Sequence, residues 1–292
     1  MRIVIVGAGI GGLTAALALL RDGHDVEVYE QAPRLAELGA GVQISANGAR
    51  VLFALGLESA LRKVWCEPAG KEIRLWNTGE TWKLFDLGAV SVARYGAPYF
   101  MIHRADLHQV LIDAVHARKP DAIRLDARCT GFADDGRSVT LHLANGTRVA
   151  GDALIAADGV NSVIRRQLFG GETVQFTGCM AWRGLIPVAR LPPRFSRNIG
   201  VNWVGPGGHV INYLLRRGEL FNFVGIVERG DWRVESWTEK GTREECAADF
   251  RDWHGDIHEL IANIEQPYKW ALLGRAPRET IARGRVALLG DA

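Results

Sequence analysis

The first thirty residues constrain the fold of this chain more than any other segment. Residues 3–7 are apolar and mostly β-branched, residues 12–22 are rich in Ala and Leu, and Asp25–Glu30 is a second strand-like run. Glycines separate the first two blocks, so the pattern predicts a strand, a tight turn, a helix and another strand. Such a βαβ unit has a right-handed crossover and belongs to a parallel sheet that is buried on both faces.

The same segment resembles a membrane helix or a signal peptide in one respect. Residues 3–20 carry no charge, a length near the roughly 18 residues of a membrane span, and Arg2 precedes them. However, four glycines (Gly7, Gly9, Gly11 and Gly12) interrupt the run, and glycine is a poor helix former. We therefore interpret the segment as a strand, a turn and a helix, and we expect no membrane partner.

Composition narrows the class of protein. The chain has 292 residues, of which 48% are hydrophobic and 23% charged, as in a soluble globular protein of about two domains. A net charge of +2 gives no reason to expect a nucleic-acid partner. The four cysteines lie far apart without metal-ligand spacing, which predicts buried thiols in a reducing cytoplasm and no metal site.

Strand and helix patterns continue to the end of the chain. The expected helices are 46–55, 104–118, 243–252 and 257–264, and the expected later strands are 124–132, 138–143, 153–157, 181–187, 200–204, 209–216, 220–228 and 285–289. Residues 285–289 form a buried apolar run like the strands of the first domain. We therefore expect this strand to belong to the first domain, which makes that domain discontinuous. We predict an α/β fold in which 1–75, 100–175 and 270–292 form a Rossmann-like domain and 76–99 and 176–269 form an inserted antiparallel β-sheet domain.

The glycine turn fits a dinucleotide-binding fingerprint. Gly7, Gly9 and Gly12 have the G-x-G-x-x-G spacing, with Gly11 inside the same turn, and Glu30 stands at the end of the second strand. In this arrangement the backbone approaches a diphosphate at the start of the helix. The Glu30 carboxylate is suited to accept hydrogen bonds from ribose hydroxyls. The fingerprint alone does not distinguish FAD from NAD.

Two later motifs resolve this ambiguity. Residues Asp158 to Arg165, which follow the expected strand 153–157, have the form D-G-x-x-S-x-x-R. The last residues of the chain are Gly290-Asp291-Ala292. With the glycine fingerprint, these motifs make the whole chain resemble the single-component FAD-dependent aromatic hydroxylases, the salicylate and 3-hydroxybenzoate hydroxylase group. The resemblance implies an FAD-binding domain, reduction by NADH or NADPH, and hydroxylation of a small aromatic acid with O2 through a flavin hydroperoxide.

The resemblance also assigns roles to individual residues. Glu30 would bind the adenosine ribose of FAD, Cys129 would contact adenine through its backbone, and Asp291 would bind the ribityl chain. Arg104, in an R-x-D-L segment, would contact the flavin cofactor; the alternative is a surface salt bridge.

Two more positions follow from the same comparison of motifs. Asp158 belongs to the motif associated with both FAD and the nicotinamide cofactor, and its alternative role is a helix N-cap. Gln43, in a stretch from Gly39 to Ile44 that resembles a flavin-side loop, would lie near the isoalloxazine. Ser162 lacks a G-x-S-x-G context, so it does not indicate a hydrolase.

The substrate side of the site is expected on the strand 209–216. Strand alternation puts His209 and Tyr213 on one face with apolar neighbours. A lone strand histidine is more often structural, but Gly205–Tyr213 resembles a segment of 3-hydroxybenzoate hydroxylases in which the histidine is the proposed base for the substrate phenol. The resemblance therefore favours His209 and Tyr213 as catalytic residues.

Several alternatives remain open at this stage. The segment around His209 favours 3-hydroxybenzoate over salicylate, and 6-hydroxynicotinate is less favoured because Gln43 stands where the nicotinate enzymes have a histidine. The rival classes are a flavin-free nicotinamide dehydrogenase and a non-enzymatic FAD- or NAD-binding redox sensor. Related hydroxylases continue beyond the Gly-Asp motif, so we expect a C-terminal helical part to be missing and FAD binding by this chain to be weak or absent.

Overall fold

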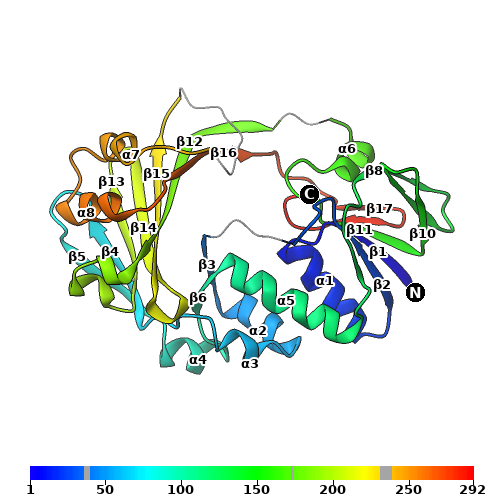
Figure 1. Ribbon diagram of the computed structural model, residues 1–292, viewed down its shortest axis with the longest axis horizontal. Helices are drawn as coiled ribbons and strands as arrows, with labels where there is room; N and C mark the ends of the chain where they lie inside the picture. Colours follow the sequence, from blue (N-terminus) through cyan, green and yellow to red (C-terminus); the bar gives the residue numbers. More distant parts are fainter. Residues whose placement is uncertain (36–39, 172–173, 231–238) are drawn as a thin grey trace.

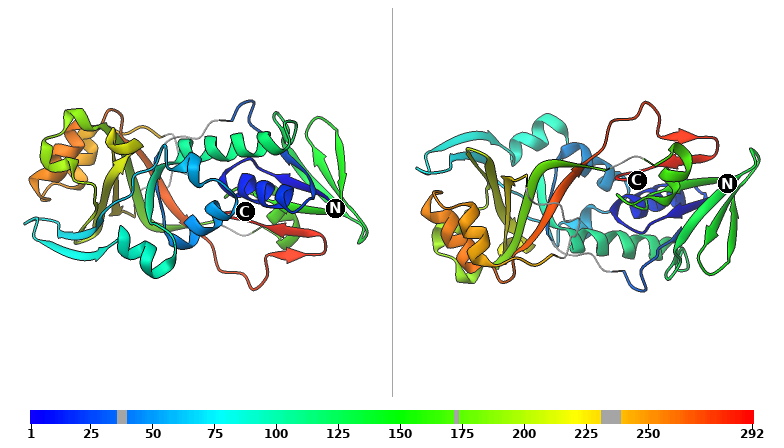
Figure 2. Two further views of the ribbon diagram at one scale, coloured as in Figure 1. Left: turned by 90° about the horizontal axis from the view of Figure 1, so that it is seen from below. Right: turned by 90° about the horizontal axis from the view of Figure 1, so that it is seen from above.

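The chain folds into a mixed α/β structure around two large β-sheets, as the computed structural model in Figure 1 shows. The structure describes residues 1–35, 40–171, 174–230 and 239–292. A six-stranded sheet lies at one end of the molecule with both chain termini, and a seven-stranded sheet lies at the other end (Figures 1 and 2). The predicted fold class, an α/β nucleotide-binding fold combined with an antiparallel sheet, is confirmed.

The six-stranded sheet has the strand order β17-β18-β11-β1-β2-β7. Its strands are β1 (Arg2–Val6), β2 (Asp25–Tyr29), β7 (Ile123–Arg124), β11 (Ala153–Ala156), β17 (Ala282–Arg283) and β18 (Val286–Leu288). As predicted, β1 pairs in parallel with β2, and it also pairs in parallel with β11. Ile3 and Ile5 enter one hydrophobic core while Val4 and Val6 enter another. The strand is apolar throughout because both of its faces are covered.

Helices cover one face of this sheet and a small sheet covers the other. Leu13 of α1 (Ile10–Arg21) and Leu107 of α5 (Arg104–Arg118) pack in the core that contains Ile5. The opposite core is closed by α6 (Val163–Phe169) and by an antiparallel sheet of β8 (Cys129–Asp134), β9 (Val139–Leu143) and β10 (Arg148–Gly151). The uncharged run 3–20 is thus divided between β1 and α1. Of the helices in the described ranges, none has both the length and the apolar character that crossing a bilayer requires.

The seven-stranded sheet has the order β16-β12-β15-β14-β13-β4-β5. Its strands are β4 (Gly70–Leu75), β5 (Thr81–Asp86), β12 (Gln175–Pro187), β13 (Gly200–Gly205), β14 (Gly208–Leu215), β15 (Leu220–Glu228) and β16 (Tyr268–Gly274). All neighbouring strands are antiparallel except β4 and β13, which are parallel. The long strands β12 and β16 extend from this sheet toward the six-stranded sheet (Figure 1).

The two faces of the seven-stranded sheet differ. We call the face covered by α7 (Arg243–Asp249) and α8 (Gly255–Asn263) the outer face. There Trp182, Trp203 and Phe223 are almost fully buried in a core that includes Phe250 of the segment after α7. The other face, which we call the inner face, looks toward the middle of the molecule, where β3 and β6 lie (Figure 1).

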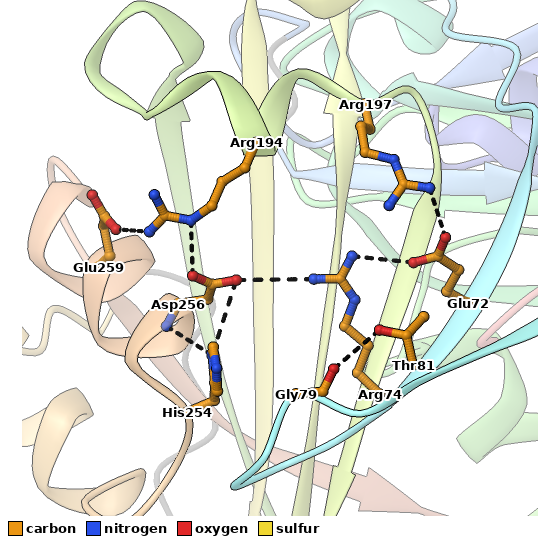
Figure 3. A network of polar contacts seen from close by, with 9 residues as sticks. All are labelled: Glu72, Arg74, Gly79, Thr81, Arg194, Arg197, His254, Asp256 and Glu259. Atoms are coloured by element: carbon orange, nitrogen blue, oxygen red, sulfur yellow. Dashed lines mark hydrogen bonds and ion pairs between the residues drawn. The ribbon is translucent and has the colours of Figure 1, made fainter.

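A network of charged side chains ties β4 to the helical layer at the outer face (Figure 3). Arg74 lies 3.1 Å from a Glu72 oxygen and 3.9 Å from an Asp256 oxygen. Arg194 donates from Nε to Asp256 at 2.9 Å and also pairs with Glu259. Because several partly buried charges share partners, this network holds α8 against the sheet more firmly than one isolated surface pair would.

A two-stranded antiparallel sheet of β3 (Gly41–Ile44) and β6 (Phe100–His103) lies between the two large sheets. The remaining α-helices are α2 (Ala46–Ala54), α3 (Glu58–Leu61) and α4 (Ala89–Tyr95), and short 3-10 helices span Val188–Arg190, Pro193–Ser196 and Arg216–Gly218. The segment expected to be a flavin-side loop is therefore partly a strand, and Gly39 lies outside the described residues.

The expected single strand at 124–132 is wrong. Residues 123–124 belong to the six-stranded sheet, whereas 129–134 belong to the three-stranded sheet. Asp126 separates them with a φ of 52°, a left-handed conformation that interrupts an extended strand. The chain therefore changes sheets within a few residues.

Strand pairing also differs from the expected domain boundaries. Residues 70–75 and 270–274 were expected in the nucleotide-binding domain, but β4 and β16 hydrogen-bond into the seven-stranded sheet. The β4–β13 pair joins residues more than a hundred positions apart, and the local pattern of residues 70–75 does not reveal such a partner.

Candidate active site

The glycine turn is held by close backbone approach at two positions. Gly7 has a φ of +99°, and a Cβ there would lie 2.2 Å from the Ala157 carbonyl oxygen. A Cβ on Gly12 would lie 2.0 Å from the Gly7 carbonyl oxygen. Both positions therefore require glycine, which lets α1 lie directly against the ends of β1 and β11.

Gly9 differs because the space beside it is open. It is the N-cap residue of α1, no side chain caps the helix, and a Cβ on Gly9 would meet no atom within 4 Å. Gly11 is next to Leu289, whose Cγ would lie 3.7 Å from an added Cβ. An open helix N-terminus with backbone N–H groups and no competing side chain fits the diphosphate of a dinucleotide.

A cavity of about 200 Å³ beside this turn brings together four of the predicted cofactor residues, namely Gly7, Glu30, Cys129 and Asp158. Glu30 is held in place because its carboxylate accepts hydrogen bonds from the Ala8 N–H at 2.8 Å and the Ala32 N–H at 2.9 Å. Burial raises the pKa of the Cys129 thiol to about 11, so at neutral pH this side chain is an unreactive thiol.

The two carboxylate oxygens of Asp158 have different hydrogen-bonding environments. Oδ2 accepts from the Val163 N–H at 2.9 Å, and the Ser162 hydroxyl accepts from the Arg165 N–H at 3.0 Å, so both side chains cap α6. The alternative role of Asp158, a helix N-cap, therefore holds for its Oδ2 atom. Oδ1 is buried and has no hydrogen-bond partner among the described residues. An unsatisfied buried carboxylate oxygen is costly, which favours a donor from a ligand in the cavity.

The Gly-Asp motif lies on the other side of the glycine turn. Gly290 has a φ of 68°, and the exposed Asp291 accepts a hydrogen bond from Arg165 through its carbonyl oxygen at 3.2 Å. Asp291 lines a separate cavity of about 480 Å³ with Arg165 and Trp270. Asp291 therefore does not share the cavity that contains Glu30. Leu289, two residues before Asp291, lies against Gly11 of the glycine turn.

Arg104 is the first residue of α5 and is partly buried, and its N–H donates to the Ala40 carbonyl oxygen at 2.9 Å. This bond places the start of α5 beside the start of β3. Gln43 lies on β3 opposite Met101 of β6. Arg104 and Gln43 thus belong to the same small sheet region, between the glycine turn and the inner face.

The inner face carries His209 and Tyr213, as the alternation predicted. On β14, Val210 and Leu214 enter the outer-face core, while His209 and Ile211 are half-buried. His209 pairs in register with Val204 and Ile226, so its neighbours on both adjacent strands are apolar. Burial lowers the pKa of His209 below its usual value of 6.5, which favours the neutral imidazole.

Tyr213 is only 3% exposed and lies against β3. A Cβ on Gly41 would be 2.5 Å from the Tyr213 ring, so only glycine fits there. Asn222, next to Tyr213 on β15, accepts a hydrogen bond from the Gly41 N–H at 2.9 Å. These contacts join the inner face to the strand that carries Gln43.

Two tyrosines converge on Gln43. Tyr99 donates a hydrogen bond to its side-chain oxygen, and the Tyr213 hydroxyl also hydrogen-bonds Gln43. Burial raises the pKa of Tyr99 to about 12 and raises the pKa of Tyr213 as well, so both hydroxyls remain protonated donors at neutral pH. His209 is not part of this cluster, because four strand residues place its Cα roughly 13 Å from that of Tyr213.

Sequence reasoning missed Tyr99 and Asn222, and it placed Arg183 close to the site without a role. Arg183 lies on β12 with its guanidinium over the Trp270 ring at 4.3 Å. The signal for Asn222 was a polar residue within an otherwise apolar strand, whereas Tyr99 joins the site only through tertiary packing. Across the described residues, His, Cys, Asp and Glu side chains form no group of three or more that would hold a metal ion.

Comparison with known proteins identifies the family. The chain matches the FAD binding domain family over residues 1–292. It is 39% identical over 291 residues to 3-amino-4-hydroxybenzoate 2-monooxygenase PtnB3 of Streptomyces platensis, covering 100% of this chain and 72% of that protein. It is 36% identical to 6-hydroxynicotinate 3-monooxygenase of Pseudomonas fluorescens, covering 100% and 75%.

A solved structure agrees with this match. Klebsiella pneumoniae HpxO complexed with FAD and uric acid superposes with a TM-score of 0.85 at 27% identity, covering 100% of this chain and 72% of that chain. The chain belongs to the family of FAD-dependent aromatic monooxygenases. Its cofactor is FAD, and the expected aromatic hydroxylase resemblance is confirmed.

Proposed function

We propose that this monooxygenase hydroxylates a small aromatic acid that already carries a ring hydroxyl, with NADH or NADPH as reductant and O2 as oxidant. The observation that carries the proposal is the placement of His209, a half-buried histidine with a lowered pKa, among apolar neighbours on the inner face. The relatives support the substrate class, because two of them are named for a hydroxybenzoate and a hydroxynicotinate.

The cofactor would extend from the 200 Å³ cavity along the glycine turn toward the inner face. Glu30 would bind the adenosine ribose, the backbone of Cys129 would contact adenine, and the N-terminus of α1 at Gly9 would bind the diphosphate. Asp158 would accept a hydrogen bond from the bound nucleotide through its free Oδ1.

Three further residues would hold the flavin end: Arg104, Gln43 and Asp291. When bound, FAD supplies the redox chemistry by which one oxygen atom of O2 reaches the aromatic ring. The protein supplies binding, orientation and proton transfer.

His209 would act as the base for the ring hydroxyl of the substrate. A phenolate ring is more electron-rich than a phenol and therefore reacts faster with an electrophilic oxygen. An imidazole that stays neutral at pH 7 accepts the phenol proton through a ring nitrogen. The apolar neighbours of His209 on both adjacent strands would limit the access of water to its imidazole.

Tyr213 would orient the substrate by donating a hydrogen bond from its hydroxyl. Since Tyr99 donates a hydrogen bond from its hydroxyl to Gln43 and Tyr213 is also bonded to Gln43 and remains protonated, Gln43 would fix the Tyr213 hydroxyl as a donor at the junction of β14 and β3. Buried, fixed donors of this kind discriminate between substrates that can and cannot accept the hydrogen bond.

The test is a panel of aromatic acids with the FAD-loaded protein. The panel contains 3-amino-4-hydroxybenzoate, 3-hydroxybenzoate, salicylate and 6-hydroxynicotinate, and NADH and NADPH oxidation, oxygen uptake and products are measured. The segment around His209 leads us to predict that the enzyme prefers 3-hydroxybenzoate to salicylate as a substrate. NAD(P)H oxidation that no aromatic acid accelerates would contradict the proposal and favour a redox sensor.

A further inference from the structure

Lys71 lies on the inner face of β4. Its strand neighbours Glu72 and Arg74 point into the outer-face network of Figure 3, so strand alternation directs Lys71 to the other side. Lys71 pairs in register with Gly200 of β13, and its Cγ would lie 3.2 Å from a Cβ on that glycine. Because Gly200 has no side chain, the Lys71 side chain lies directly over β13, the strand next to β14.

The Lys71 ammonium group is close to the candidate active site. Its nitrogen lies 5.0 Å from the centre of the Tyr99 ring, and Tyr99 donates a hydrogen bond to Gln43. Lys71 therefore contacts the tyrosine–glutamine cluster that also includes Tyr213. A cation over an aromatic face is only modestly stabilised when it is partly exposed to water.

No anion balances the charge of Lys71 within the described residues. Arg74 pairs with Glu72, Arg216 pairs with Asp106, and Lys269 pairs with Glu245, whereas Lys71 forms no ion pair or hydrogen bond with a described residue. Burial lowers the pKa of Lys71, as expected for an ammonium group that loses water without gaining a carboxylate. A half-buried cation without a partner is a ready site for a ligand anion.

From this placement we infer that Lys71 binds the carboxylate of the aromatic acid and so makes the enzyme selective for acids over uncharged phenols. This inference rests on the proposed function. Arg183 is another inner-face cation near the site, but its guanidinium stacks on Trp270 and it has further interactions. Four strand spacings separate β12 from β4, about 19 Å, so the two cations would anchor a small ring in different positions.

The test compares Lys71→Met and Lys71→Arg in the FAD-loaded enzyme. The probes are 3-amino-4-hydroxybenzoate and 2-aminophenol, which differ only in the carboxylate, with 3-hydroxybenzoate and phenol as a second pair. Equilibrium binding is measured by tryptophan or flavin fluorescence, and kcat/KM by NADH oxidation. The matched control is Lys83→Met on the neighbouring strand β5, where Lys83 is 67% exposed and pairs with Asp86.

For Lys71→Met we expect the Kd of the acids to rise about tenfold or more, while that of the phenols changes less than about twofold. Lys71→Arg should retain most of the acid preference, and Lys83→Met all of it. Since Lys71 has no ion-pair or hydrogen-bond partner among the described residues and only a modest contact with the Tyr99 ring, thermal stability should fall little. Should Lys71→Met fail to fold, Lys71→Gln replaces it.

Two failures are distinguishable. Wild-type enzyme that hydroxylates an acid, together with an unchanged acid-to-phenol ratio in Lys71→Met, would refute the role of Lys71 alone. Wild-type enzyme that neither binds nor responds to any of the acids would refute the proposed function and this inference with it.

Discussion

Gly9 and Gly12 stand three residues apart in the same turn, yet a methyl group has different consequences at each. An added Cβ at Gly12 would overlap the Gly7 carbonyl oxygen, whereas at Gly9 it would point into open space. We expect Gly12→Ala to lower the free energy of unfolding by about 2 kcal/mol or more. Gly9→Ala should cost less than about 1 kcal/mol but weaken FAD binding at least about tenfold.

Urea unfolding of the apoprotein and FAD titration measure these two effects separately. If Gly9→Ala bound FAD as tightly as wild type, the diphosphate would not lie at the start of α1. Equal stability of Gly12→Ala and wild type would mean that α1 is not packed as described.

The lowered pKa of His209 predicts how the hydroxylation rate depends on pH under acidic conditions. Because burial lowers its pKa, the neutral base persists below pH 6.5, and the rate falls only as pH drops through this lowered pKa and the imidazole becomes protonated. His209→Gln should lower kcat for hydroxylation by about a hundredfold or more at pH 7 and leave FAD affinity within about threefold.

The diagnostic result is partial recovery at high pH. In His209→Gln, the rate should rise toward the pKa of the phenol itself, roughly 10, because the substrate then ionises without a protein base. Profiles of kcat/KM for both proteins provide the measurement, and a variant with the wild-type profile would exclude His209 as the base.

At the scale of single residues, the sequence was informative where a local pattern fixes the role. The glycines and Glu30 sit within one βαβ unit, so their spacing determines where they meet. Lys71 approaches the site through the pairing of β4 with the distant strand β13. Tyr99 and Asn222 reach β3 through hydrogen bonds with Gln43 and Gly41, and no local spacing encodes these contacts.

One ion pair connects the two large elements that flank the site. Arg216, in the turn after β14, pairs with Asp106 in the first turn of α5 through two contacts of 2.9 Å. Arg216 also has a φ of 48°, so it adopts a left-handed conformation that a non-glycine residue normally avoids. The pair fixes the end of the strand that carries Tyr213 against the helix that begins at Arg104.

A double-mutant cycle of Arg216→Ala and Asp106→Asn tests this connection. We expect a coupling free energy of about 0.5–1 kcal/mol in the unfolding equilibrium, because the pair is bidentate but the arginine is partly exposed. Salt should reduce the coupling. Additive single effects would show that the two elements are held together by other contacts.

At the scale of elements, periodicity predicted the longer helices and many of the strands but not where a strand leaves its sheet. Asp126 breaks 124–132 into two strands by its backbone conformation, which residue type alone does not signal. The exposed edge strand β5 lacks the alternation of a half-buried strand, since all six of its residues are exposed.

For the whole molecule, cofactor binding should stabilise both ends of the structure together. The proposed FAD site draws on the six-stranded sheet at Gly9 and on β3, which is bonded to the seven-stranded sheet through Asn222. At an FAD concentration of a hundred times Kd, the stabilisation should be about 2.7 kcal/mol. Thermal unfolding followed by tryptophan fluorescence and by far-ultraviolet circular dichroism should shift upward equally.

Unequal shifts by the two probes would indicate that the ends unfold independently. The Gly9→Ala variant is the control, because it should fold normally and show a reduced shift at the same FAD concentration.

The unequal burial of the two faces of the seven-stranded sheet has a consequence for evolution. Substitutions among the tryptophans and phenylalanines under α7 and α8 disturb a dense interior, so few will be tolerated. Half-buried positions on the opposite side, such as Asn202 and Val224, are not part of that interior. New substrate preferences can therefore arise there by single steps, which offers one explanation for a scaffold shared by enzymes named for such different aromatic compounds.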